Sequence, residues 1–357
     1  MFRRRSRMPS FAFASVGLLA IHFAFSYSEA AVNPHPPSQP VKITPLGSHA
    51  GEFCRNDRAL IFEDPTGVRV LWDPGRTING GTDARLGDVH VMLLSHAHSD
   101  HIGDTKPNIG SPGTCASPNT VSAAPNSNFA DIAAAKNSAV LVPGELSDFL
   151  ARKIQNIKGV ATAGCPAAGL NNELVVPRSS PCTATLRPGG SRTVRFNGAS
   201  EGVKIITVPA FHSNGIPASL IDSPGVAPGT TGYGGDPAGY VIRFTNGLTV
   251  YLTGDTGLFG DMETVIRKFY DPTVLVINLS DTATLGPDEA AFATNKLIKP
   301  RTVIPSHINE QATTSGQPTG ERLTRFLDQL KPGTDVVLPL SGSVFMFDDR
   351  GRCVNCP

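Results

Sequence analysis

Residues 89–101 read VHVMLLSHAHSDH, an apolar run followed at once by three histidines and an aspartate within six positions. The run Val89–Leu94 is typical of a buried β-strand that ends at the edge of a sheet. His96 and His98 stand two positions apart, so both can point the same way while the backbone is still extended. Asp100 and His101 come after the turn and can face a second point nearby. Imidazole and carboxylate groups together suit zinc, iron or manganese, so this segment predicts a metal site.

Three further potential ligands stand where other apolar runs end. His212 follows the run 204–208, Asp255 lies in the TGDTG segment after the run 249–252, and His307 follows the run 302–305. The glycines beside Asp255 allow another part of the backbone to approach closely. Each residue alone is a weak signal, because Asp255 could be a turn residue and His212 a surface histidine. Together they complete two sets of metal ligands, all at strand ends.

Short apolar runs rich in β-branched residues alternate along the chain with segments of helical period. We expect strands at 41–45, 59–63, 68–72, 90–94, 204–208, 240–244, 249–252, 274–278, 302–305, 336–338 and 344–347. We expect helices at 129–136, 146–157, 262–269, 288–298 and 321–330. Early hairpins followed by alternating strands and helices predict an α/β fold with two sheets between layers of helices. Residues 105–128, 159–190 and 222–238 are rich in small and turn-forming residues, so we expect long loops there.

In this order, HAHSDH (96–101), the isolated His212, TGDTG (253–257) and PSH (305–307) resemble the signature of the metallo-β-lactamase fold. Two further stretches, GDTGLFGDM (254–262) and LGPDEAA (285–291), are similar to those of the ascorbate-6-phosphate-lactonase-like metal-dependent hydrolases in that superfamily. The resemblance covers residues 41–348. It implies an αββα four-layer sandwich of the metallo-β-lactamase type, with 41–348 as the catalytic domain.

The resemblance also implies the ligand sets. One metal ion would be held by His96, His98 and His212, a second by Asp100, His101 and His307, and Asp255 would bridge the two. Asp73 matches an early aspartate of the family, which orients a metal ligand from behind, although a strand-ending turn explains it as well. His49 and Asp281 fall where the fold often places residues at the mouth of the site.

Two divalent ions predict a hydrolase mechanism. Ions about 3.5–4 Å apart can share a hydroxide and lower its pKa from about 15.7 toward about 7. Asp100 would orient that hydroxide and carry its proton to the leaving group, and Asp73 and Asp281 complete the candidate catalytic residues. Zinc is the first choice because the ligand set is rich in histidine, and Mn²⁺ and Fe²⁺ also fit. The fold does not fix the substrate, so several classes stay open. We rank small carboxylic esters and lactones first, phosphodiesters second and β-lactams third.

Two other classes of protein compete with the hydrolase. Related folds carry out redox chemistry at iron, but the common di-iron variant has Glu where this chain has His98, and no flavin-binding domain is apparent. An inert protein that sequesters a metal or a small ligand is the second alternative. An inert descendant of an enzyme would be expected to have lost some of its metal ligands, and all seven expected ligands are present.

The first 30 residues differ in charge from the rest. The 357-residue chain is 40% hydrophobic and 17% charged, with a formal net charge of +1, and it contains no internal apolar run long enough for a membrane span. Residues 1–30 contain four arginines against Glu29, so removing their net +3 leaves the rest at −2. This balance argues against a nucleic-acid partner bound through phosphates and leaves a small-molecule substrate. No feature of the sequence predicts an oligomeric state.

The same 30 residues predict an export signal. Arginines at positions 3–7, an apolar segment at 11–25 and Ser28-Glu29-Ala30 before Ala31 form a signal peptide, so the protein would be periplasmic or secreted. An uncleaved anchor is the alternative, but 15 apolar residues are few for a span of roughly 20. We expect no stable membrane span after cleavage. Residues 31–40 form a Pro-rich, flexible lead-in.

Six cysteines remain after residue 30, and an even number in an exported chain favours disulfides. Cys165 and Cys182 flank one Gly/Pro-rich segment and form a plausible local pair. Cys353 and Cys356 form a CxxC motif in the tail 349–357, where we expect a structural disulfide or an exposed tail rather than a redox pair or half a zinc site.

Overall fold

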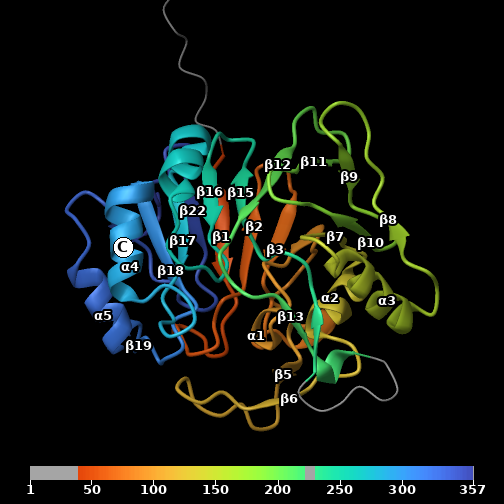
Figure 1. Cartoon of the computed structure of the whole chain (residues 1–357), viewed down its shortest axis with the longest axis horizontal. Coiled ribbons are helices and arrows are strands. Elements are labelled where there is room, and N and C mark those ends of the chain that lie inside the picture. The colour runs from red at the N-terminus through yellow and green to blue at the C-terminus, as the bar shows by residue number, and fades with distance from the viewer. Residues whose placement is uncertain (1–38, 222–229, 357) are drawn as a thin grey trace, which may run out of the picture. The chain divides into compact units, whose positions relative to one another are not determined.

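The computed structural model describes residues 39–221 and 230–356 (Figure 1). The predicted signal peptide (1–30), nearly all of the lead-in (31–40) and residues 222–229 of the third predicted loop lie outside the described residues. Residues Ser38–Pro357 make up one compact unit. Within the described ranges, no helix is both long enough and apolar enough to cross a bilayer.

The first sheet is antiparallel at one end and parallel at the other. Its strands, in spatial order, are β22 (Phe345–Phe347), β1 (Val41–Pro45), β2 (Leu60–Glu63), β3 (Arg69–Trp72), β4 (Val91–Leu93), β7 (Ala139–Val142), β10 (Cys182–Thr185) and β8 (Ala163–Gly164). β2 and β3 pair as a hairpin with Leu60 opposite Trp72. The Asp64 carboxylate accepts the N–H of Thr66 and closes its turn, where Gly67 has φ +95°.

The second sheet is parallel at both ends, with antiparallel pairs between them. Its strands, in spatial order, are β21 (Asp335–Val336), β18 (Thr302–Ser306), β17 (Val274–Asn278), β16 (Thr249–Leu252), β15 (Ala238–Arg243), β12 (Val203–Pro209), β11 (Ser191–Phe196) and β9 (Leu174–Val176). β16, β17 and β18 run parallel, and β15 is antiparallel to both β16 and β12. The ends of β12, β16 and β18 therefore lie at one edge of the sheet.

Helices cover the outer faces of both sheets. α2 (Asn128–Lys136) and α3 (Leu146–Lys158) pack on the first sheet, and η3 (Met262–Tyr270), α4 (Pro287–Phe292), η4 (Ala293–Ile298) and α5 (Glu321–Asp328) pack on the second (Figure 1). Each outer apolar cluster joins helix and sheet, while a third cluster fills the space between the sheets. The prediction of an αββα four-layer sandwich is confirmed.

Local sequence explains where these helices begin and end. The Ser127 hydroxyl accepts the N–H of Ala130 at the start of α2, and Asn137 ends that helix with φ +52°. In α5, Leu323 and Phe326 are buried in the expected stripe. The helix predicted at 288–298 is divided between α4 and the π-helical η4, and the predicted helix 262–269 is the π-helical η3.

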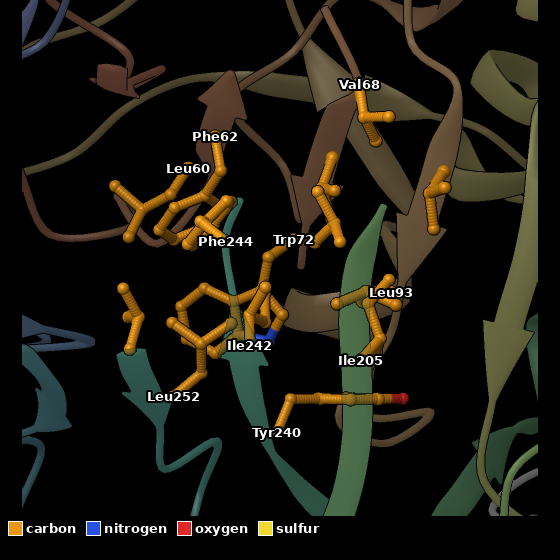
Figure 2. Packing of buried hydrophobic residues seen from close by; sticks show 14 of the residues in the cluster. Leu60, Phe62, Val68, Trp72, Leu93, Ile205, Tyr240, Ile242, Phe244 and Leu252 are labelled. Atoms are coloured by element: carbon orange, nitrogen blue, oxygen red, sulfur yellow. The ribbon is translucent and has the colours of Figure 1, made fainter. Parts of the chain in front are cut away.

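Side chains from both sheets interdigitate between them (Figure 2). Phe62 and Phe244 stack with ring centroids 5.9 Å apart, one from each sheet. The Tyr240 hydroxyl crosses from the second sheet and donates to the carbonyl of Leu94, at 2.8 Å. This bond fixes the end of β4 directly before Ser95 and His96.

The prediction of long loops is wrong for much of 159–190. That segment supplies β8 and β10 at one end of the first sheet and β9 at one end of the second. It therefore extends both sheets and is not a loop throughout. These strands are short and bordered by Gly and Pro, which hid their periodicity. The strand β7 was also missed. Residues 105–128 form a hairpin of β5 (Thr105–Pro107) and β6 (Thr120–Ser122) before α2, and 230–238 contain β14 (Thr231–Tyr233), which pairs with β13 (Gly215–Pro217).

All six cysteines form disulfides: Cys54–Cys115, Cys165–Cys182 and Cys353–Cys356. The predicted local pair and a disulfide in the tail are therefore confirmed, and its structural role stays a prediction. The tail folds back on β22, since the Val354 N–H donates to the carbonyl of Met346 at 2.7 Å.

Candidate metal centre

Four strand ends meet where the two sheets face each other. β4 leads into His96, β12 into His212, β16 into Asp255 and β18 into His307. The helical turn α1 (Ser99–Ile102) follows the first histidines and carries Asp100 and His101, and Gly103 ends it with φ +73°. The structure thus brings together all seven side chains that the sequence predicted as ligands.

The first ligand group contains His96, His98 and His212, whose donor atoms lie within 4.8 Å of one another. His212 Nε2 and His98 Nδ1 are 3.1 Å apart. His96 is fully buried, whereas His98 and His212 border solvent.

The second group contains Asp100, His101 and His307, again with donor atoms within 4.8 Å. His307 Nε2 lies 3.1 Å from Asp100 Oδ2, and His101 Nε2 lies 3.8 Å from the same oxygen. The Asp100 side chain is 27% exposed, so this group also reaches solvent.

The Asp255 carboxylate lies between the two groups. Its Oδ2 is 3.6 Å from His212 Nε2 and 3.3 Å from His307 Nε2, and its Oδ1 is 3.3 Å from His101 Nε2. This position is the one a bridging ligand requires. The turn needs Gly254, because a Cβ there would lie 2.8 Å from the Ser95 Cβ, and φ at this glycine is +60°.

Asp73 supports the ligands from behind. Its Oδ2 lies 2.7 Å from His101 Nδ1, and its two oxygens accept the N–H and the hydroxyl of Ser95 at 2.7 and 2.6 Å. The Ser95 oxygen lies 3.0 Å from His96 Nδ1 and can accept its proton. Both rings are held through Nδ1, which leaves Nε2 directed at the centre.

Three of the donor atoms that face the centre have no hydrogen-bond partner. His96 Nε2, His101 Nε2 and Asp255 Oδ1 are buried and make no hydrogen bond. Buried polar atoms almost always have a hydrogen-bond partner, so three such atoms without one at a single point indicate a binding site for a cation. Imidazole nitrogens and carboxylate oxygens are the ligands that zinc and its neighbours take, and the residues therefore fit a metal.

Sequence reasoning missed the residue behind Asp100. Arg58 is only 2% exposed, and its Nη2 lies 3.1 Å from Asp100 Oδ2 while its Nη1 donates to the Asp100 carbonyl at 3.0 Å. Asn214 was missed as well: its Oδ1 accepts the N–H of Ala97, at 2.7 Å, and its Nδ2 donates to the carbonyl of Gly234. Neither residue lies in a motif, and their partners are 42 and 117 positions away, so the sequence held no signal for them.

Burial and charge divide the imidazoles into two kinds. Burial lowers the pKa of His96, His98 and His212, which keeps these three rings neutral at neutral pH. Burial also opposes the charged form of His101, but Asp255, Asp100 and Asp73 outweigh it and raise the pKa of His101 to about 10.

The carboxylates are shifted the other way. Burial alone would raise the pKa of Asp100 and of Asp255. Arg58 and His101 instead hold the pKa of Asp100 well below its usual range, and His307 and His101 lower that of Asp255. Both carboxylates are thus ionised and ready to bind a cation.

The two predicted mouth residues lie outside the ligand groups. Asp281 is exposed, accepts the N–H of Thr282 at 2.7 Å and lines an acidic pocket beside α4 and α5 with Asp288 and Glu289. His49 lies 3.0 Å from the Ser48 hydroxyl and 3.3 Å from the Gly113 carbonyl, next to the hairpin of β5 and β6. The structure records no contact of either residue with a ligand side chain in the described part of the chain.

The four-layer fold and the two joined ligand groups are those of a metal-dependent hydrolase of the metallo-β-lactamase type. The chain matches the model of the β-lactamase superfamily domain over residues 56–307. It is 30% identical over 299 residues to a UPF0173 metal-dependent hydrolase of Cupriavidus necator, covering 81% of this chain and 85% of that one. A UPF0173 metal-dependent hydrolase of Pelotomaculum thermopropionicum is 31% identical over 271 residues, or 75% of this chain and 85% of that protein.

Among solved structures, the chain is similar to Igni18, a metallo hydrolase from the archaeon Ignicoccus hospitalis. The TM-score is 0.50 at 20% identity, over 86% of this chain and 99% of that one, a likeness of fold. The chain belongs to the β-lactamase superfamily and, within it, to the UPF0173 metal-dependent hydrolases.

We expect the protein to bind about two divalent ions, one in each ligand group. His98→Ala removes a ligand of the first group only and should leave about one ion per chain, measured by elemental analysis after dialysis. The matched control is His49→Ala, which changes a histidine with partners outside both groups and should keep both ions. Equal metal contents in His98→Ala and the wild type would contradict the assignment.

Metal binding should also release a proton. Near pH 7.5 the His101 ring is protonated, because its pKa is about 10, and it must become neutral to ligate, whereas His96, His98 and His212 are already neutral. We therefore expect about one proton per chain to be released from His101 on loading, in addition to any that a shared water releases, measured by calorimetry in two buffers of different ionisation enthalpy. A binding enthalpy that is the same in both buffers would show this prediction to be wrong.

Proposed function

We propose that this metal-dependent hydrolase cleaves small carboxylic esters or lactones at a pair of zinc ions, with residues 41–348 as its catalytic domain. The observation that carries the proposal is the position of Asp255, whose carboxylate faces the imidazoles of both ligand groups within 3.6 Å. Two divalent ions held there would polarise a substrate carbonyl and bring the pKa of a shared water to about 7. Five imidazoles against two carboxylates favour zinc over Mn²⁺ or Fe²⁺.

Asp100 is the residue best placed to handle the proton. It is the carboxylate that is partly open to solvent, and Arg58 fixes both its side chain and its backbone carbonyl. In the proposed reaction, Asp100 accepts a hydrogen bond from the attacking water and thereby orients it. The same carboxylate can then carry the proton of that water to the leaving group.

Arg58 also bears on the substrate. The guanidinium next to the ligands is buried and already bonded to Asp100 and to the carbonyl of Asn56. Its Nη atoms are therefore occupied and its Nε is buried, so the guanidinium is poorly placed to bind a phosphoryl oxygen, whereas a neutral carbonyl needs no such partner. This favours esters and lactones over phosphodiesters.

The test is a hydrolysis panel with metal-free and zinc-loaded protein. We expect turnover of p-nitrophenyl esters or lactones that stringent chelation abolishes and zinc restores, while bis-p-nitrophenyl phosphate and nitrocefin are cleaved more slowly. His98→Ala serves as the matched control, because it removes a ligand without disturbing the core, and its activity should fall at least roughly 100-fold. Full ester hydrolysis after chelation would contradict the metal-dependent mechanism. Faster cleavage of the phosphodiester would show that the proposed substrate class is wrong.

We further propose that the protein is exported to the periplasm or the medium. The arginines of residues 1–7, the apolar segment 11–25 and the small residues before Ala31 support this, and three disulfides suit an oxidising compartment.

Expression of the full chain in a Gram-negative host tests export. N-terminal sequencing of the periplasmic or secreted protein should begin Ala31-Val32-Asn33, because the signal peptide is cleaved after Ala30. The control is a variant in which four arginines are changed together to Glu, and it should stay uncleaved in the cytoplasm; the four are Arg3, Arg4, Arg5 and Arg7. A wild-type chain that stays in the cytoplasm with Met1 intact would overturn the proposal.

A further inference from the structure

An apolar surface lies on the two loops that carry the ligands His212 and Asp255. Phe211 directly precedes His212 and is 63% exposed, and Leu258 follows Asp255 by three positions and is 40% exposed. Phe259 lies next to Phe211, with ring centroids 5.1 Å apart. We call these three residues the apolar shelf.

The shelf is held in place and is not a loose loop. The Phe211 N–H donates to the Thr256 hydroxyl at 2.9 Å, and the Gly257 N–H donates back to the Phe211 carbonyl at 3.1 Å. Phe259 packs against the apolar cluster beneath the second sheet, so the exposed Phe211 ring rests on an anchored one. Two loops from different strands therefore present one fixed apolar surface to solvent.

The shelf residues lie close to two ligands in the sequence. His212 Nε2 lies 3.1 Å from His98 Nδ1 and 3.6 Å from Asp255 Oδ2, and His212 and Asp255 belong to the two loops that carry the shelf. A substrate carbonyl at the centre would place its substituents within reach of these loops. The ligand side chains are polar, so an apolar substituent of the substrate would pack on the shelf and not on the ligands.

We propose that the apolar shelf binds the acyl chain or ring of the substrate, which makes the substrate a hydrophobic carboxylic ester or lactone; this deepens the proposed function and rests on it. Burying exposed apolar surface on both partners provides the attraction. The shelf residues act on binding and selectivity, not on the proton or the nucleophile.

The experiment measures binding and not turnover. Straight-chain hydroxamic acids from acetohydroxamic to octanohydroxamic acid carry one metal-chelating head and a growing apolar tail, and calorimetry gives their affinities for the zinc-loaded protein. We expect affinity to rise roughly two- to fourfold per added methylene until the shelf is covered.

Phe211→Ser should flatten this dependence on chain length and leave acetohydroxamic acid binding unchanged. Phe269→Ser is the matched control, because Phe269 is 71% exposed at the other end of η3, and it should keep the wild-type dependence. Leu258→Ser provides a second shelf variant if Phe211→Ser does not fold, and circular dichroism and metal content verify each variant.

The outcomes separate the shelf from the proposed function. Affinities that do not depend on chain length in the wild type, or a dependence that survives in both shelf variants, would overturn the shelf. Failure of the zinc-loaded protein to hydrolyse any ester or lactone would overturn the proposed function alone, because a Phe211-dependent rise in hydroxamate affinity would still support a site for hydrophobic ligands.

Discussion

The contact of one carboxylate, Asp255, with imidazoles of both ligand groups is the constraint that organises this molecule. For Asp255 to lie between His212, His101 and His307, at 3.3 to 3.6 Å from their Nε2 atoms, the ends of strands from two sheets must meet at one edge. The parallel arrangement of β16 with β18, and of β4 with β3, brings those ends to that edge. The close approach of the two turns requires a residue without a side chain at 254.

Gathering histidines and ionised carboxylates in a buried space is costly without a cation, and the surrounding structure offsets that cost. The side chains between the sheets provide apolar burial, and Tyr240 ties the second sheet to the end of β4 (Figure 2). Cys54–Cys115 joins the loop before β2 to the hairpin of β5 and β6. The same loop carries Arg58, so the disulfide and the contact with Asp100 restrain one segment from two sides.

Local patterns were sufficient for the fold class and for gathering the ligands, because both depend on short-range order. HAHSDH after an apolar strand, and single ligands after three others, reflect strand ends that any such sheet brings together. The short strand β10 was missed because its neighbours Pro181 and Pro188 resemble loop sequence, although its hydrogen bonds come from β7 and β8. Arg58 and Asn214 were missed for another reason: their partners are distant in sequence, and an isolated arginine or asparagine indicates nothing about its burial.

The division between strands and loops also separates chemistry from selectivity. Asp73 and Ser95 hold His96 and His101 against rigid strands, which fixes the geometry that a metal needs. Phe211 and Leu258 lie in the loops that follow β12 and β16, where substitutions change the surface offered to a substrate without replacing a ligand. A family name that specifies a metal-dependent hydrolase therefore describes the ligands at the strand ends, and in the proposed reaction the substrate is selected by side chains beyond those ligands.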